Sequence, residues 1–142
     1  MSAVDEVLAA AAEVVRAFGS GDVEGYFGCF APDATFVFHS TPRVLGSREA
    51  YREEWASWER ADGFLVLDCT SSEQRVQDLG DVAVFTHRVR TLVHAAGEQA
   101  ELHERETIVF RRADDGRWLA VHEHLSPDPG AVVSAEAGVA AG

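Results

Sequence analysis

Residues 106–126 read ETIVFRRADDGRWLAVHEHLS, two alternating segments joined by a short polar turn. Apolar side chains recur at every second position on both sides of Asp114-Asp115-Gly116, which is typical of a β-hairpin with one buried face. The same alternation extends back to Phe64. It predicts four long strands, at about 64–77, 82–95, 99–112 and 117–125.

The chain before Phe64 has helical spacing instead. Ser2 and Ser47 are suited to cap helices that run to Phe18 and to about Arg60. Between these helices, Asp22 can cap a shorter one, and Thr35–Ser40 reads as a short strand. The apolar faces expected for the three helices are, in order, Val4, Val7, Leu8, Ala11, Val14, Val15 and Phe18; Val23, Tyr26, Phe27 and Phe30; and Ala50, Tyr51, Trp55 and Trp58.

Three helices followed by a meander of long antiparallel strands indicate an α+β fold. The 142 residues suffice for one domain, which we expect at residues 1–126. Residues 127–142 contain two prolines and are otherwise rich in glycine and alanine, so we expect a weakly packed tail.

The charge of the chain argues against several partners. It has 24 acidic and 12 basic residues, a net charge of −12, so nucleic acids and anionic membranes are poor candidates. All the basic residues are arginine, which excludes chemistry that depends on a lysine. No apolar run approaches the roughly 20 residues that span a bilayer. Cys29 and Cys69 lie in apolar segments, as expected for the reduced thiols of a cytoplasmic protein.

Three stretches resemble the nuclear transport factor 2-like superfamily, in its SnoaL-like and ketosteroid-isomerase-like branch. They are SGDVEGYF with FAPDAT at 20–27 and 30–35, GSREAY at 46–51, and the hairpin at 106–126. The hairpin also resembles the association domain of calcium/calmodulin-dependent kinase II. The resemblance implies a cone-shaped, curved antiparallel sheet wrapped around three N-terminal helices. It also implies a deep apolar pocket and a homodimer formed through the outer face of the sheet.

Two glutamates are the main catalytic candidates. If residues 113–116 form the turn, Glu106 lies opposite Glu123 on the more apolar face of the hairpin. Two buried carboxylates cannot both ionise cheaply, so such a pair suits acid/base chemistry. The resemblance points the same way, since Glu106 matches the protonated acid of ketosteroid isomerases and Glu123 the catalytic acid of SnoaL-type cyclases. The alternative is a register shifted by one residue, which would leave both acids exposed.

The catalytic base is less clear. The catalytic base of the ketosteroid isomerases would fall at Phe38, which cannot accept a proton. Their catalytic tyrosine would fall near Val14, which has no hydroxyl group. The remaining candidates are His87, Glu123 and His39. His87 alternates with buried positions and should point inward, although it can equally be a hydrogen-bonded core residue.

Further residues are candidates for binding. Phe38, Tyr51 and Trp55 can supply an aromatic pocket wall, or can simply pack between helix and sheet. The direction of the Arg88 side chain is undecided, because strand alternation predicts the outer face of the sheet whereas the kinase resemblance implies the pocket.

His122 and His124 project from the same side of a strand and could share a metal ion. The predicted register offers no third ligand and sets Arg105 beside them, so we expect no metal there and assign the pair to an outer, dimer-forming face. The sequence carries no nucleotide, flavin or haem motif, so we expect no cofactor.

Two functions follow from these expectations. The first is a SnoaL-like protein that binds a hydrophobic small molecule, with the chemistry of a cofactor-independent isomerase, cyclase or dehydratase acting on a carbonyl compound. The second is a non-catalytic ligand-binding or homo-oligomerisation module. Whether the chain is an enzyme is left open by the sequence.

Overall fold

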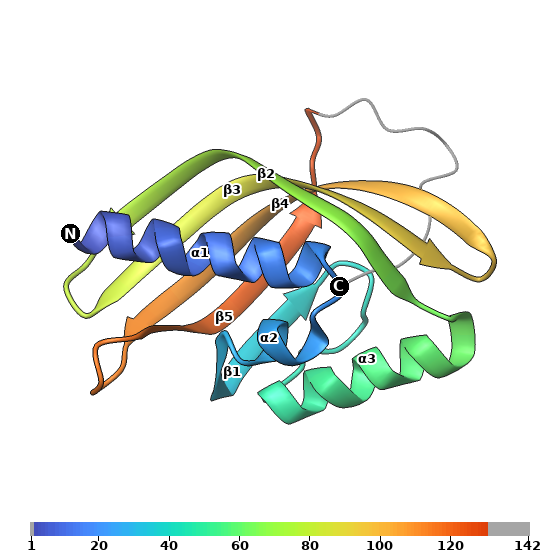
Figure 1. Ribbon diagram of the computed structural model, residues 1–142, viewed down its shortest axis with the longest axis horizontal. Helices are drawn as coiled ribbons and strands as arrows, with labels where there is room; N and C mark the ends of the chain where they lie inside the picture. Colours follow the sequence, from blue (N-terminus) through green and yellow to red (C-terminus); the bar gives the residue numbers. More distant parts are fainter. Residues whose placement is uncertain (1, 131–142) are drawn as a thin grey trace.

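The computed structural model describes residues 2–130. Most of the predicted tail therefore lies outside the described residues; of its first residues, Pro127 ends a strand and Asp128 is buried. Three helices and five strands form in the predicted order (Figure 1). They are α1 (Ala3–Gly19), α2 (Val23–Phe27), β1 (Phe30–Phe38), α3 (Arg48–Asp62), β2 (Leu65–Asp78), β3 (Val82–Ala95), β4 (Glu98–Arg112) and β5 (Trp118–Pro127).

Capping residues set the ends of the two longer helices. The Ser2 hydroxyl accepts a hydrogen bond from the Asp5 amide (3.1 Å), and the Ser47 hydroxyl accepts one from the Ala50 amide (3.0 Å). Each bond satisfies an amide that has no partner within the helix. Helix α3 ends at Gly63, whose φ of 62° is left-handed and favours glycine. The Asp22 carboxylate likewise accepts a hydrogen bond from the Gly25 amide (2.9 Å), so all three predicted caps are confirmed.

The sheet has the order β1-β5-β4-β3-β2. The four long strands form the predicted antiparallel meander. Strand β1 is an edge strand of the sheet and pairs with β5 in parallel. Strand β1 begins at Phe30, earlier than predicted, and Phe30 belongs to it and not to the short helix. The reason is tertiary, because the Ala120 amide donates to the Cys29 carbonyl (2.9 Å) and extends the pairing with β5.

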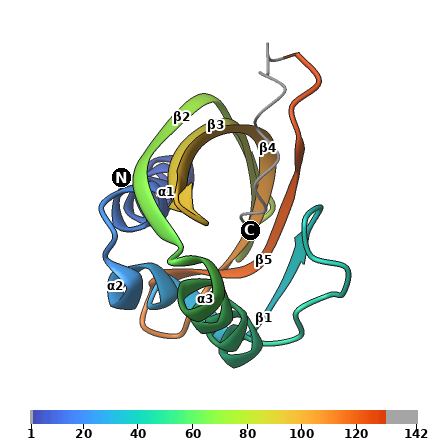
Figure 2. The ribbon, with the colours of Figure 1, turned by 90° about the vertical axis from the view of Figure 1, so that its right-hand side faces the viewer.

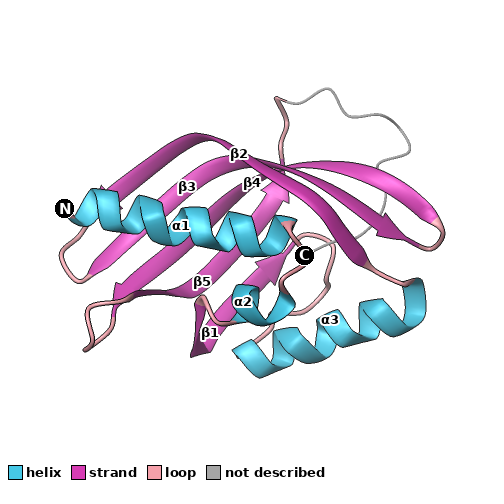
Figure 3. Cartoon of the chain, in the orientation of Figure 1, coloured by secondary structure: helices cyan, strands magenta, loops and turns pink. Residues whose placement is uncertain are grey.

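The sheet is strongly curved. Seen end-on, β2 to β5 bend around an interior, with α3 below it (Figure 2). Helix α1 crosses the sheet on the side that carries α2 and α3 (Figure 3), and it contacts β2 most extensively. The α+β fold with an open, curved five-stranded sheet is thus confirmed, and its core lies between α1 and the inner face.

The register of the β4–β5 hairpin differs from the prediction. Arg112 pairs with Trp118 and not with Arg117, because the connection is one residue longer than expected. A β-bulge at Val121 adds a second residue of offset between Val109 and Phe110.

The acids are therefore not directly opposite one another. Glu106 pairs with Leu125, and Glu123 pairs with Ile108. Because side chains alternate with a period of two, an offset of two residues returns them to the same face. Both glutamates point inward, one step apart along the hairpin, and the alternative of exposed acids is excluded.

None of the described helices is both long enough and apolar enough to cross a membrane.

Candidate functional site

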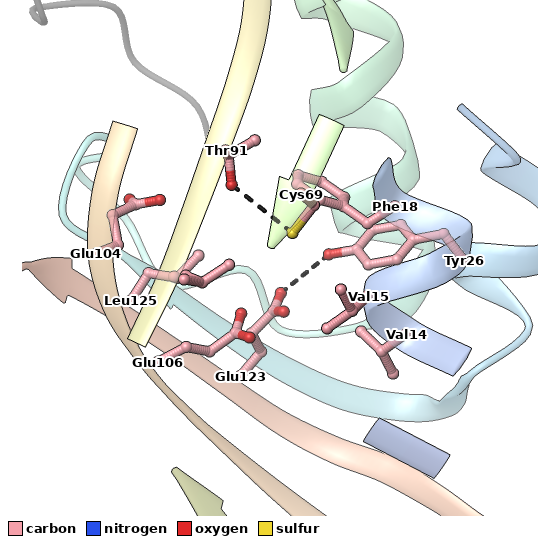
Figure 4. A pocket seen from close by; sticks show the side chains of 11 residues that line it. Val14, Val15, Phe18, Tyr26, Cys69, Thr91, Glu104, Glu106, Glu123 and Leu125 are labelled. Atoms are coloured by element: carbon pink, nitrogen blue, oxygen red, sulfur yellow. Dashed lines mark hydrogen bonds between the residues drawn. The ribbon is translucent and has the colours of Figure 1, made fainter. Parts of the chain in front are cut away.

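A small cavity lies between α1 and the inner face of the sheet (Figure 4). Its volume is about 20 Å³, enough for roughly one water molecule. Its wall is apolar where α1 faces it and acidic where β4 and β5 face it. The lining residues are Val14, Val15, Phe18, Tyr26, Cys69, Val89, Thr91, Glu104, Glu106, Glu123 and Leu125.

Glu106 and Glu123 form the centre of the acidic wall, with exposed fractions of 8% and 2%. Burial raises the pKa of Glu106 to about 7, although a hydrogen bond from Glu123 lowers it in part. Burial raises the pKa of Glu123 far above its ordinary range, and the nearby charge of Glu106 raises it further. At neutral pH the proton that the pair shares therefore resides on Glu123, which donates to Glu106.

His87 is bound to the other side of Glu106. Its Nε2 lies 2.6 Å from Glu106 Oε1, and its Nδ1 lies 2.6 Å from the Ser71 hydroxyl. Burial lowers the pKa of His87 to about 4, so the ring is neutral and carries one N–H. Gln74 donates to the Ser71 oxygen (2.9 Å), which leaves the Ser71 hydroxyl free to donate to Nδ1. The Nε2–H then donates to the Glu106 carboxylate.

Tyr26 continues the chain of hydrogen bonds from Glu123. Its hydroxyl donates to Glu123 Oε1 (3.2 Å) and shares a hydrogen bond with the Tyr51 hydroxyl (2.9 Å). Burial raises the pKa of both phenols, so both stay protonated. The sequence indicated Tyr26 only as a core residue. A buried phenol needs a partner, and that need was the available signal.

Glu104 is a third buried acid and was not among the predicted site residues. Its Oε2 lies 2.6 Å from His39 Nε2, and its pKa is raised to about 8 by burial and by the charge of Glu123. Burial lowers the pKa of His39, whose side chain is 36% exposed. The Glu104–His39 pair thus connects the cavity wall to the surface. Strand alternation predicts the inward direction of Glu104, but its partner His39 lies in the turn that directly follows β1.

The predicted aromatic residues lie behind the cavity and do not line it. Phe38, Tyr51 and Trp55 belong to one aromatic cluster, with ring centroids 5.0 Å apart for Phe38 and Tyr51 and 6.1 Å apart for Tyr51 and Trp55. Trp55 also packs on Phe18 and Tyr26, which do line the cavity. Its buried indole nitrogen has no hydrogen-bond partner within residues 2–130.

Arg88 lies on the outer face of the sheet, as strand alternation predicts, and its Nε is 2.9 Å from a Glu73 carboxylate oxygen. His122 and His124 also point outward, and His122 Nδ1 bonds to the Thr35 hydroxyl (2.8 Å). Within residues 2–130, no group of three metal-ligating side chains comes together.

The comparisons with known proteins agree with this fold. The family model of the SnoaL-like domain matches residues 7–129. A search of curated proteins by sequence gives no match.

Three solved structures illustrate the likeness. A nuclear transport factor 2-like protein from Cytophaga hutchinsonii has a TM-score of 0.76 at 16% identity, covering 90% of this chain and 100% of its own. A proposed dehydratase of that family from Streptomyces avermitilis has a TM-score of 0.72 at 22% identity, covering 89% and 97%. A proposed calcium/calmodulin-dependent kinase II association domain from Xanthomonas campestris has a TM-score of 0.66 at 22% identity, covering 92% and 91%. At these identities the likeness shows the fold alone.

Proposed function

The chain belongs to the SnoaL-like domain family, and we propose that it is a cofactor-independent acid/base enzyme of the isomerase, cyclase or dehydratase type. Its substrate is a small hydrophobic compound with a carbonyl group. The carrying observation is the buried Glu106–Glu123 pair, bonded to His87 and Tyr26 at an otherwise apolar cavity. The dehydratase proposal for the Streptomyces avermitilis structure is consistent with this chemistry.

In this proposal the two acids take opposite roles. Glu123, held protonated, donates its proton to the carbonyl oxygen, while the Glu106 carboxylate removes a proton from the adjacent carbon. The product is an enol, with the abstracted proton now on Glu106 and with Glu123 ionised. Glu106 then returns that proton, either to another carbon of the enol or to a departing hydroxyl group, which leaves as water, and Glu123 takes back the proton of the enol oxygen. His87 orients Glu106 and stabilises its charge through the Nε2–H.

Substrate entry requires a local opening, because the cavity holds only about one water molecule. Val14, Val15 and Phe18 form the side that α1 contributes. We propose that α1 moves away from the sheet when a substrate enters. The indole N–H of Trp55, which has no partner within residues 2–130 and whose ring packs on Phe18, would then be available to a polar group of the ligand.

Deuterium exchange tests this proposal without knowledge of the natural substrate. A panel of enolisable cyclic ketones is incubated with the protein in D₂O, and loss of the α-proton signal is followed by NMR. We expect exchange above background for the wild type, and a loss of about tenfold or more in Glu106→Gln and Glu123→Gln. Glu98→Gln, an exposed change on the same strand as Glu106, is the control. Equal exchange rates in all four proteins would refute the acid/base function.

A homodimer is the second part of the proposal. Val84 and Val109 are paired and half-buried on the outer face, and they form an apolar surface that a second copy of the chain could cover. The likeness to an association domain supports this choice of partner. Light scattering should give the dimer mass, and Val109→Glu should give the monomer mass. A dimeric protein that exchanges no ketone proton would favour the non-catalytic alternative.

We also propose that the protein works in the cytoplasm. Cys29 and Cys69 are free, and burial raises their thiol pKa values to about 11 and about 12. Such thiols are unreactive, as suits a reducing compartment.

A further inference from the structure

The outer face of the sheet carries a groove of about 420 Å³, which we call the outer groove. Two rows of side chains cross it from β2 to β5. In one row Arg75, Thr86, Thr107 and His124 pair in sequence, and in the other Ser72, Arg88, Arg105 and Ser126 do so. Because side chains on one face of neighbouring strands point the same way, the two rows bring three arginines, His124 and several hydroxyl groups to the groove. Glu73 on β2 also lines it, and His87 and Glu106 contribute to its floor from between the rows.

Three arginines outnumber the two glutamates in this lining, which is the reverse of the chain as a whole, where acidic residues are twice as many as basic ones. Arg88 is neutralised, since its Nε lies 2.9 Å from Glu73 and 3.5 Å from Asp128. Arg75 and Arg105 are exposed, and neither forms an ion pair within residues 2–130. By contrast, seven of the twelve arginines do pair with an acid: Arg16, Arg43, Arg52, Arg88, Arg90, Arg111 and Arg112.

The arrangement also places like charges together. Arg88 and Arg105 are directly paired across β3 and β4, where neighbouring like charges destabilise a sheet. Packing does not require these arginines, because Arg105 is exposed and its neighbours are polar. Glu73 and Asp128 offset this repulsion at Arg88, whereas Arg105 has no acidic partner within residues 2–130, and a bound anion would supply one.

We propose that the outer groove binds a small molecule through an oxyanion group, either a phosphate or a carboxylate. Guanidinium groups present paired N–H donors that match such oxygens, and Thr107 and Ser126 add hydroxyl donors on the floor. The volume suits a metabolite-sized ligand. The strongly acidic chain as a whole would repel a polyanion such as nucleic acid. This site is separate from the cavity under α1 and does not depend on the acid/base function. It begins at Thr86 and Thr107, one outward-facing pair beyond Val84 and Val109, so it lies beside the surface proposed for the dimer contact.

Isothermal titration at low ionic strength tests the site, with inorganic phosphate as one probe and succinate as the other. We expect saturable binding of at least one probe, and the tighter of the two identifies the preferred oxyanion. Arg105→Gln should weaken this binding by about tenfold, as the loss of one charge-assisted contact predicts. Arg75→Gln should act in the same direction.

Arg60→Gln is the matched control, because Arg60 is an exposed arginine on α3 without an ion pair in the described part of the chain. It removes the same charge at a distance and should leave the affinity within about twofold. If Arg60→Gln and Arg105→Gln weakened binding equally, the effect would be due to the net charge of the protein alone, and the proposed site would be refuted. Absence of saturable binding of both probes to the folded wild type would also overturn it.

Discussion

Single residues carry the unusual chemistry of this protein, and the three inward glutamates are the clearest case. An isolated carboxylate in an apolar interior is so unfavourable that the group takes up a proton instead. Here Glu104 and Glu123 are protonated in this way, while burial raises the pKa of Glu106 only to about 7, because a hydrogen bond from Glu123 lowers it in part. The same cavity wall thus holds two protonated acids and one carboxylate whose pKa lies close to physiological pH.

Carboxyl titration by carbon-detected NMR checks this distribution of protons. We expect Glu104 to titrate with a pKa of about 8 and Glu106 with a pKa of about 7, since both are buried. Glu104→Gln and Glu106→Gln assign the signals. If both groups titrated near the ordinary value of ~4.3, the site would be solvated and the acid/base proposal would fail.

Tyr26 should be the most important phenol for stability. Tyr26→Phe removes the donor to Glu123 and the partner of the Tyr51 hydroxyl, leaving two buried oxygens short of a bond. We expect a loss of about 1–3 kcal/mol in the free energy of unfolding. Urea denaturation measures it, with Tyr51→Phe as the comparison, because that change breaks only the shared bond. An equal or larger loss in Tyr51→Phe would contradict this account.

At the level of elements, local irregularities place the site residues. The bulge at Val121 compensates for the longer turn, so that Glu123 returns to the inner face. Without the bulge an offset of one residue would turn Glu123 toward solvent. The N-terminus of α3 is similarly set by one side chain, Ser47.

Ser47→Ala should therefore weaken α3. The change removes the hydrogen bond to the Ala50 amide, and loss of such a cap costs about 1 kcal/mol. Thermal denaturation should show a lower midpoint for this variant. Ser72→Ala, which removes an exposed hydroxyl on β2 that has no bond to another described side chain, should leave the midpoint unchanged. Equal midpoints for the two variants would show that the cap is dispensable.

For the molecule as a whole, the buried acids make stability depend on pH. The pKa values of Glu104, Glu106 and Glu123 are raised on folding, so above pH 4.5 the folded state binds more protons than the unfolded state at these groups. The excess extends to about pH 7 at Glu106, to about pH 8 at Glu104 and higher at Glu123. Their effect is to lower stability as the pH rises, until the folded-state pKa values are passed. His87 acts in the opposite sense, since its pKa is lowered, but only between about pH 4 and 6.5.

We expect the midpoint of thermal unfolding to fall from pH 6.5 to pH 8, where His87 no longer contributes. Each proton retained only by the folded state is worth about 1.4 kcal/mol per pH unit. Glu123→Gln replaces a neutral acid by a neutral amide and should flatten this dependence. A wild-type midpoint that rises over the same interval would contradict the protonation of the buried acids.

The order of the elements, and the extent of all but β1, can be read from the sequence, because hydrophobic periodicity and capping residues act locally. The helix from Ser2 to Gly19, the long strands after Phe64 and the inward direction of Glu106 and His87 all follow from spacing along the chain. The acidic pair could also be proposed, since a register error of two residues does not change the face.

Contacts between distant segments could not be predicted from periodicity and capping residues. The parallel pairing of β1 with β5, the bond from Tyr26 to Glu123 and the pair of His39 with Glu104 join residues far apart in the chain. The volume of the cavity depends on how Val14, Val15 and Phe18 pack against the sheet. Periodicity assigns a side chain to a face, whereas its partner on that face depends on three-dimensional packing, to which every element contributes at once.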